Sequence, residues 1–287
     1  MQTQAFTIVE VIIFLAVSSL LLVSAFALIA GQQQRAEFTQ AINDIQIQIN
    51  DVINNVATGY YANTGNFKCT SNGVNGPQLS GDTNIQGTNQ GCVFIGRAIQ
   101  FAVKDTNRSG FNVYNLVGQR QIDNSGVLSD VTNLAESKPV AISPSEDPSH
   151  ASVPNGEEKK QLLYGLQAMT MNCTPDCGES FFGSPIKNSG VVAFVTDFAA
   201  PDTGGLTGST RTVGLYSILF THVNDDGQTA AEAVRFIDIP DAALFRPVSG
   251  VVICFEGGIN QHGIITIGGN NRQLSTTLAI NNGGCPT

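Results

Sequence analysis

The first sixty residues change their hydrophobic pattern once, near Gly31. Residues 11–30 are apolar apart from three serines, and no Lys or Arg precedes Arg35. A helix rises about 1.5 Å per residue, so this run is long enough to span a hydrocarbon core of ~30 Å. A retained transmembrane segment is therefore predicted over residues 9–30. The alternative is a secretory signal peptide, which usually has a basic start and a shorter apolar stretch.

Beyond Gly31, apolar residues recur at intervals of three and four. This spacing is typical of an amphipathic helix, and Gly31 is the only strong helix-weakening residue between Phe6 and Thr58. We therefore predict one helix over residues 6–58. Its second half has an apolar stripe that a head domain, a neighbouring subunit or both must cover. The stripe consists of Phe38, Ile42, Ile45, Ile49, Val52 and Val56, widened by Ala41 and Ile53.

Residues 59–287 have the pattern of a β-rich globular head. Runs of β-branched and aromatic residues between turn clusters predict strands over residues 93–103, 111–122, 191–198, 212–223 and 233–239. A three-strand meander is predicted at the carboxyl end, over residues 251–255, 264–267 and 274–280. The expected fold class is α+β, with the long helix packed on this head.

Two segments of the head are harder to interpret from their pattern. Residues 123–160 are rich in Pro, Ser and charged residues and have little apolar pattern, which predicts a long exposed loop. Residues 161–171 fit either a strand or a helix. Residues 224–227, Asn-Asp-Asp-Gly, predict a hairpin turn rather than a calcium loop, because the alternating acids and the distant Glu of such a loop are missing.

Glu10 places a carboxylate at the start of the apolar run. With Thr7 three residues before it, Glu10 has the spacing of a capping box, which would only start the helix. It could also lie at the level of the lipid headgroups. A third interpretation is functional, because an acid in a membrane segment is costly and needs a partner. That partner would be a free amine created by cleavage just before Phe6 on an adjacent chain.

These residues together resemble the prepilin signature of type IV pilins and pseudopilins. The shared features are a short leader, a small residue (Ala5), then Phe6, Glu10 as the fifth mature residue, and about twenty apolar residues. The resemblance covers residues 5–58. It implies that a membrane aspartyl peptidase removes residues 1–5 and methylates the Phe6 amine. It also implies that Glu10 pairs with that amine on a neighbouring subunit during assembly.

The sequence departs from the family pattern in two ways. Ala5 stands where the family usually has Gly, and the leader has no basic residue. By the positive-inside rule, Arg35 points to the opposite orientation, so the orientation rests on the resemblance.

The resemblance implies a structural role. The chain would be a subunit of a helical filament, built from copies of itself or related pilins on a pilus assembly platform. It would lie in the inner membrane as a precursor and on the cell surface after assembly. One alternative is a minor pseudopilin, or a tip adhesion or binding module, of a pilus or type II secretion system. Another is a simple membrane-anchored surface protein.

The terminal meander loosely resembles the β-sandwich-like heads of H-class minor pseudopilins and their pilus counterparts. Some pilins of that group bind DNA through basic head residues. Here only Arg272 lies in the turns of the meander. The head has 13 basic and 19 acidic residues, a net charge of −6, whereas nucleic-acid binding calls for a basic surface. Nucleic acid is therefore an unexpected partner.

The six cysteines all follow the apolar run. In an exported head, an even number of cysteines indicates disulfides. Proximity in sequence favours three pairs among fifteen possible connectivities: Cys69 with Cys92, Cys173 with Cys177, and Cys254 with Cys285. The close pair Cys173 and Cys177 could instead form half of a zinc site, but no His lies near it and no second close pair occurs.

Catalytic motifs are missing from the sequence. It contains no G-x-S-x-G, H-E-x-x-H, P-loop or dinucleotide fingerprint. Of the three histidines, His150 falls in the predicted loop, and His222 and His262 border predicted turns. We expect no enzymatic activity, no cofactor and no metal site.

Overall fold

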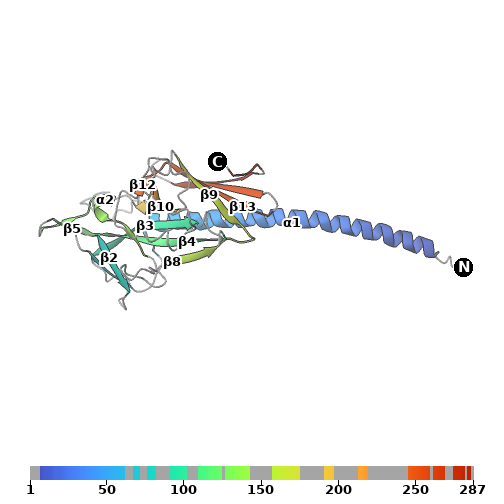
Figure 1. The fold of residues 1–287 in the computed structure, drawn as a ribbon, viewed down its shortest axis with the longest axis horizontal. Coiled ribbons are helices and arrows are strands. Elements are labelled where there is room, and N and C mark those ends of the chain that lie inside the picture. The colour runs from blue at the N-terminus through green and yellow to red at the C-terminus, as the bar shows by residue number, and fades with distance from the viewer. Residues whose placement is uncertain are drawn as a thin grey trace, which may run out of the picture.

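A 51-residue helix, α1 (Ile8–Thr58), projects from a β-rich head in the computed structural model of the chain (Figure 1). The fold is α+β, as the sequence predicts. The structure describes residues 7–61, 67–71, 76–81, 91–101, 109–124, 127–142, 157–174, 191–196, 213–218, 245–258, 261–268, 274–281 and 283–285.

Both ends of α1 have the caps that local sequence favours. Thr7 is the N-cap with extended backbone (φ −75°, ψ 150°), and its side chain accepts a hydrogen bond from the Glu10 amide. At the other end Gly59 is left-handed (φ 71°) and its amide donates to the Val56 carbonyl. Glycine adopts this conformation without the steric cost of a Cβ, so it ends the helix cleanly.

Two antiparallel sheets form the body of the head. The larger has the order β12 (Phe245–Pro247), β11 (Val213–Ile218), β10 (Val191–Thr196), β3 (Cys92–Phe101), β4 (Gly110–Gln119) and β7 (Val140–Ala141), and β8 (Glu157–Gln161) also pairs with β4. The smaller has the order β15 (Ser275–Asn281), β14 (Gln261–Gly268), β13 (Gly250–Gly257) and β9 (Gln167–Thr174). Strands β13 to β15 form the predicted terminal meander.

Small elements complete the described head. One hairpin joins β1 (Phe67–Ser71) to β2 (Pro77–Gly81), and another joins β5 (Gln121–Asn124) to β6 (Val127–Asp130). A one-turn helix, α2 (Leu134–Ser137), precedes β7.

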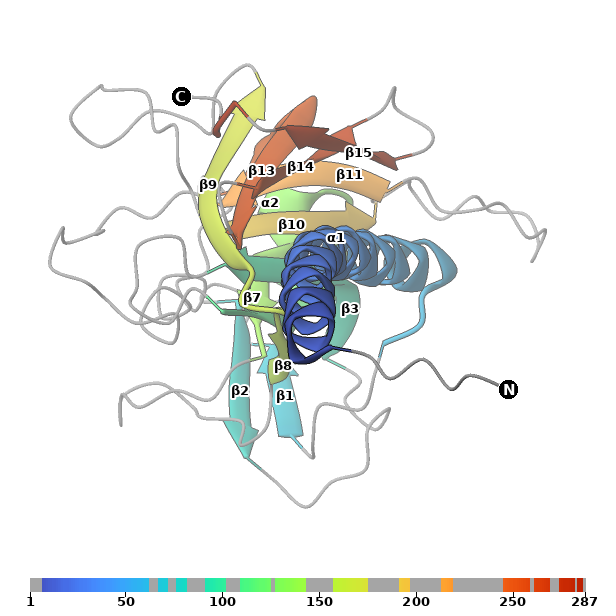
Figure 2. The ribbon, with the colours of Figure 1, turned by 90° about the vertical axis from the view of Figure 1, so that its right-hand side faces the viewer.

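The second half of α1 packs against both sheets and completes the main core. Figure 2 looks along α1 and shows this half running beside β10 and β3, with β13 to β15 above it. All eight residues of the predicted stripe are buried, which confirms the periodicity argument. They share one cluster with residues of both sheets, among them Phe101, Phe111, Phe194, Val251, Phe255 and Ile265. The helix is therefore an integral part of the head core.

Two glycines of the smaller sheet make room for α1. A Cβ on Gly257 would lie 2.8 Å from Cδ2 of Phe38, and a Cβ on Gly263 would lie 2.7 Å from Cδ1 and Cγ1 of Ile42. Both distances are shorter than van der Waals contact. The helix can therefore approach β13 and β14 closely only because these positions carry no side chain.

The prediction of one exposed loop over residues 123–160 is wrong for its described part. That part contains β6, α2, β7 and most of β8, and Val140, Ala141 and Ile142 are buried. The apolar run at 140–142 is too short to show a period. Strand β8, with the sequence EEKKQ, is held by main-chain pairing with β4 rather than by strand-forming residue types.

Two other predictions need adjustment. The strand predicted over 111–122 is interrupted near Arg120, so that β5 leaves the larger sheet and pairs with β6. The ambiguous segment 161–171 contains no helix; β8 ends at Gln161 and β9 begins at Gln167. Some predictions fall on residues that the structure does not describe. They concern the turn at 224–227, the strand at 233–239, His150, His222 and Arg272.

Candidate functional site

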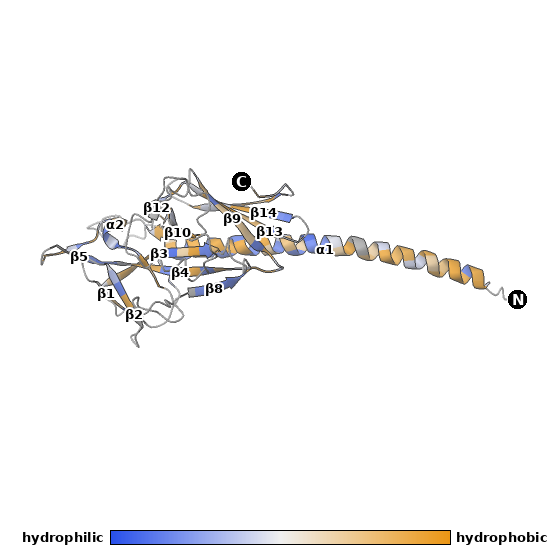
Figure 3. Cartoon of the chain, viewed as in Figure 1, coloured by the Kyte–Doolittle hydropathy of each residue, from blue (hydrophilic) through white to orange (hydrophobic). Residues whose placement is uncertain are grey.

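The first half of α1 is an apolar cylinder that the head does not cover. The large apolar side chains that the structure describes in this half are all exposed. Examples are Ile8 (80%), Phe14 (70%), Leu20 (72%) and Ile29 (60%). Figure 3 shows that hydrophobic residues predominate along the coloured part of this half. By length and composition it could cross a membrane. A helix that is apolar on all sides needs lipid or other helices around it.

Two of the three serines in this half bond to the backbone of the helix. Ser19 Oγ donates to the carbonyl of Ala16 (2.9 Å), and Ser24 Oγ donates to the carbonyl of Leu21 (2.8 Å). Their hydroxyls are thus satisfied by the backbone of α1 itself. Glu10 is the only acidic or basic side chain in residues 8–30.

Glu10 and Thr7 form the capping box that their spacing predicts. Glu10 Oε2 accepts from the Thr7 amide (2.9 Å) and from Thr7 Oγ1 (3.0 Å), and the Glu10 amide donates to Thr7 Oγ1 (3.3 Å). Glu10 is exposed, and its carboxylate is held at the extreme end of the apolar cylinder. This geometry satisfies two helix-start amides. It also places a single negative charge in the first turn of the helix.

A short polar segment separates the two halves of α1. Residues 31–37 have the sequence GQQQRAE, and none of them is buried. Gln33 Nε2 donates to Glu37 Oε1 (2.8 Å) along this segment. The head begins to cover the helix at Phe38, which is 4% exposed.

Polar contacts fix α1 to the edge strand β15. Gln46 Nε2 donates to the carbonyl and the Oγ1 of Thr276, both at 3.1 Å, and Thr276 Oγ1 donates to Asn50 Oδ1 (3.0 Å). These contacts join residues more than 200 positions apart. They join the helix to the smaller sheet, and nothing in the local sequence indicated them.

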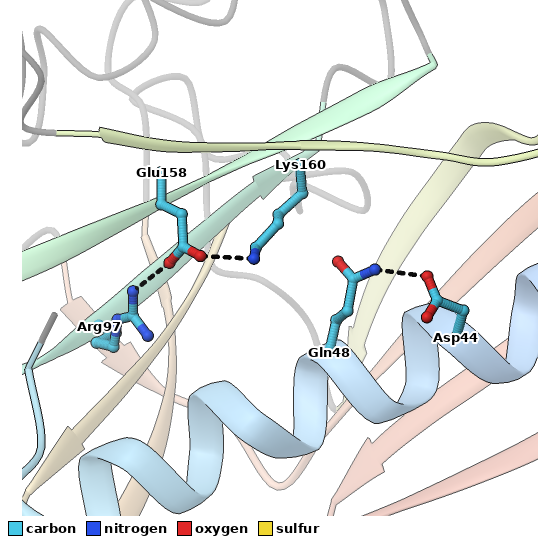
Figure 4. Close-up of polar contacts among 5 residues, drawn as sticks. All are labelled: Asp44, Gln48, Arg97, Glu158 and Lys160. Carbon is cyan, nitrogen blue, oxygen red and sulfur yellow. Dashed lines mark hydrogen bonds and ion pairs between the residues drawn. The ribbon is translucent and has the colours of Figure 1, made fainter.

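A charged cluster lies between α1 and the larger sheet (Figure 4). Arg97, 2% exposed, donates from Nη2 to Glu158 Oε2 (2.7 Å), and Lys160 pairs with the other oxygen of Glu158. Burial raises the pKa of Glu158, but hydrogen bonds and charges from Lys160 and Arg97 outweigh it, so the pKa lies below its ordinary value. On α1, Gln48 Nε2 donates to Asp44 Oδ2 (2.6 Å) nearby.

The disulfides agree with the pairing by proximity where they are described. Cys69 is bonded to Cys92, and Cys254 is bonded to Cys285. Cys173 is also disulfide-bonded, and its predicted partner Cys177 lies outside the described residues. Among the described residues, no group of three or more His, Cys, Asp or Glu side chains could hold a metal ion.

Ala5 and Phe6, the predicted cleavage site, lie outside the described residues, so their roles stay predictions. His262 lies at the start of β14 and is half-buried.

Searches against protein families, curated proteins and solved structures found no match to this chain.

Proposed function

We propose that the chain is a type IV pilin-like subunit that is processed before Phe6 and assembled into a filament by packing of its N-terminal helices. The observation that carries the proposal is the division of α1. One half is apolar apart from Glu10 and three serines and is uncovered, and the other half is built into the core of the head. The apolar half of such a subunit can move from lipid to a position among neighbouring helices while the head stays folded.

The energetics of the free half favour transfer between apolar surroundings rather than exposure to water. Burying one Val, Leu, Ile or Phe side chain stabilises by about 1.5–3 kcal/mol. Fourteen such side chains are exposed between Ile8 and Ile29. The apolar half would lie in the inner membrane before assembly and in the filament core afterwards, with the heads on the outside.

Glu10 would set the register of this packing. Removal of residues 1–5 would leave a positive amine on Phe6, four residues before Glu10. In a core of apolar helices, an unpaired carboxylate is costly. The arrangement that places Glu10 of one subunit beside the Phe6 amine of its neighbour removes that cost, and other registers do not.

Two replacements of Glu10 separate capping from charge pairing. Gln at the third helical position can still serve a capping box, whereas Ala cannot. We expect Glu10→Gln and Glu10→Ala both to insert into membranes and both to fail to form filaments. The measurement is the amount of subunit in sheared cell-surface material relative to membranes. Normal filaments from Glu10→Gln would show that the charge is not needed and would refute the register mechanism.

A further inference from the structure

The turn between β8 and β9, residues 162–166, exposes two apolar side chains between two buried ones. Leu162 and Leu166 are 6% and 0% exposed and belong to the main core, whereas Leu163 and Tyr164 are 47% and 51% exposed. The Leu162 amide donates to the Ser109 carbonyl (2.7 Å), and the Leu166 amide donates to the Leu163 carbonyl (3.1 Å). The two exposed side chains are therefore presented by a turn that is anchored at both ends.

The backbone of this turn is unusual for an aromatic residue. Tyr164 has a left-handed conformation (φ 54°), as does Gly165 after it (φ 69°). Bulky side chains rarely adopt this region, because their Cβ crowds the backbone. Strain of this kind tends to be kept where it serves a function. Here its effect is to hold an aromatic ring on the surface beside Leu163.

The turn lies at the end of the head from which the apolar half of α1 emerges. A Cβ on Gly257 would lie within 3.4 Å of both Phe38 and Leu166, so these two side chains meet at one place. Phe38 is the first residue of α1 that the head buries. Figure 1 shows β8 running toward this end of the head.

We propose that Leu163 and Tyr164 rest in the headgroup layer of the membrane that holds α1 and so orient the head of the unassembled subunit. This rests on the membrane-inserted precursor of the proposed function. Ala30 and Phe38 are eight residues apart, about 12 Å along the helix. The headgroup layer adds about 5–7 Å beyond the hydrocarbon, and membrane helices tilt by about 20° on average. Part of the distance between the headgroup layer and the level of Phe38 therefore remains. A tilt of α1 toward β8, together with the length of the Leu163 and Tyr164 side chains, brings the turn into the headgroup layer.

The chemistry of the turn suits a lipid interface. Tyr is enriched at membrane–water boundaries because its ring is apolar and its hydroxyl is polar. The charges near this end of the head are of both signs, with Lys160 paired to Glu158 and Glu256 beside Gly257. The contact is thus apolar rather than electrostatic. It does not require anionic lipid and should persist at high salt.

The chain contains no Trp, so single Trp replacements report on chosen positions. The full chain would be reconstituted into phosphatidylcholine vesicles with bromine, a Trp quencher, on acyl carbons: near the headgroup in one set of vesicles and near the chain ends in another. Tyr164→Trp reports on the turn and Leu22→Trp on the apolar half of α1. Tyr60→Trp is the matched control, because Tyr60 is 63% exposed but about 30 Å along α1 from Phe38.

The expected result is loss of fluorescence for Tyr164→Trp in vesicles brominated near the headgroup and for Leu22→Trp in vesicles brominated near the chain ends, with Tyr60→Trp unchanged in both. Quenching of Leu22→Trp alone would overturn the turn contact while leaving membrane insertion intact. No quenching of Leu22→Trp would refute insertion itself, and this inference with it.

Equal quenching of Tyr60→Trp would indicate unspecific adsorption. A blue shift of Tyr164→Trp without bromine quenching, and only at high protein-to-lipid ratio, would identify a second copy as the occupant. Either of these last two results would also overturn the proposal.

Discussion

Ile49 and Ile47 give a direct test of how α1 is built into the head. They are the same residue type two positions apart on one helix, but Ile49 is 0% exposed and Ile47 is 59% exposed. Ile49→Ala removes three carbons from the shared core and leaves a cavity, for which the expected loss is about 2–5 kcal/mol of unfolding free energy. Ile47→Ala removes the same atoms from a solvated surface and should change stability by no more than about 0.5 kcal/mol.

The assay is urea unfolding of the full chain in a non-denaturing detergent, followed by far-ultraviolet circular dichroism. The difference between the two midpoints, multiplied by the common slope, gives the difference in free energy. Equal and small losses for both variants would mean that the head folds without α1. That result would refute the conclusion that the helix completes the head core.

Three further predictions use the same assay. The cysteines of the Cys69–Cys92 bridge are 23 residues apart. Replacing both should lower the free energy of unfolding by about 2–4 kcal/mol, mostly because the unfolded chain gains freedom. A loss of less than about 1 kcal/mol would contradict this. The pKa of Glu158 is lowered in the fold, so its stabilisation is complete above the ordinary value of 4.5 and is lost as pH falls further. The advantage of wild type over Glu158→Gln should therefore shrink below that pH, and a constant difference would refute the ion-pair argument. Gly263→Ala should cost about 1–3 kcal/mol, because its methyl meets the fully buried Ile42; an unchanged midpoint would show that α1 can shift without cost.

The features that local sequence determines were predictable. The 3.6-residue period of α1 predicted every buried position of its second half, because a helix has only one way to turn an apolar stripe toward a core. The capping box at Thr7 and Glu10 and the terminal meander also depend on neighbours in sequence.

The features that depend on the arrangement of strands were not predictable. Arg97 and Glu158 are 61 residues apart and meet only because β3 and β8 both pair with β4. The sequence of β8 is charged and disfavours a strand, so main-chain pairing overrode residue propensity. Gly257 and Gly263 looked like turn residues, yet they lie within strands where the helix needs space.

The amino-terminal mass of the protein is the most direct test of processing before Phe6 and of assembly into a filament. It should be measured for protein from sheared cell-surface material and, separately, from membranes. We expect a terminal peptide that begins at methylated Phe6 and is abundant in the sheared fraction. A peptide that still begins at Met1, confined to the membranes of cells that otherwise carry filaments, would contradict it. Glu10 would then be the helix cap of an ordinary membrane anchor.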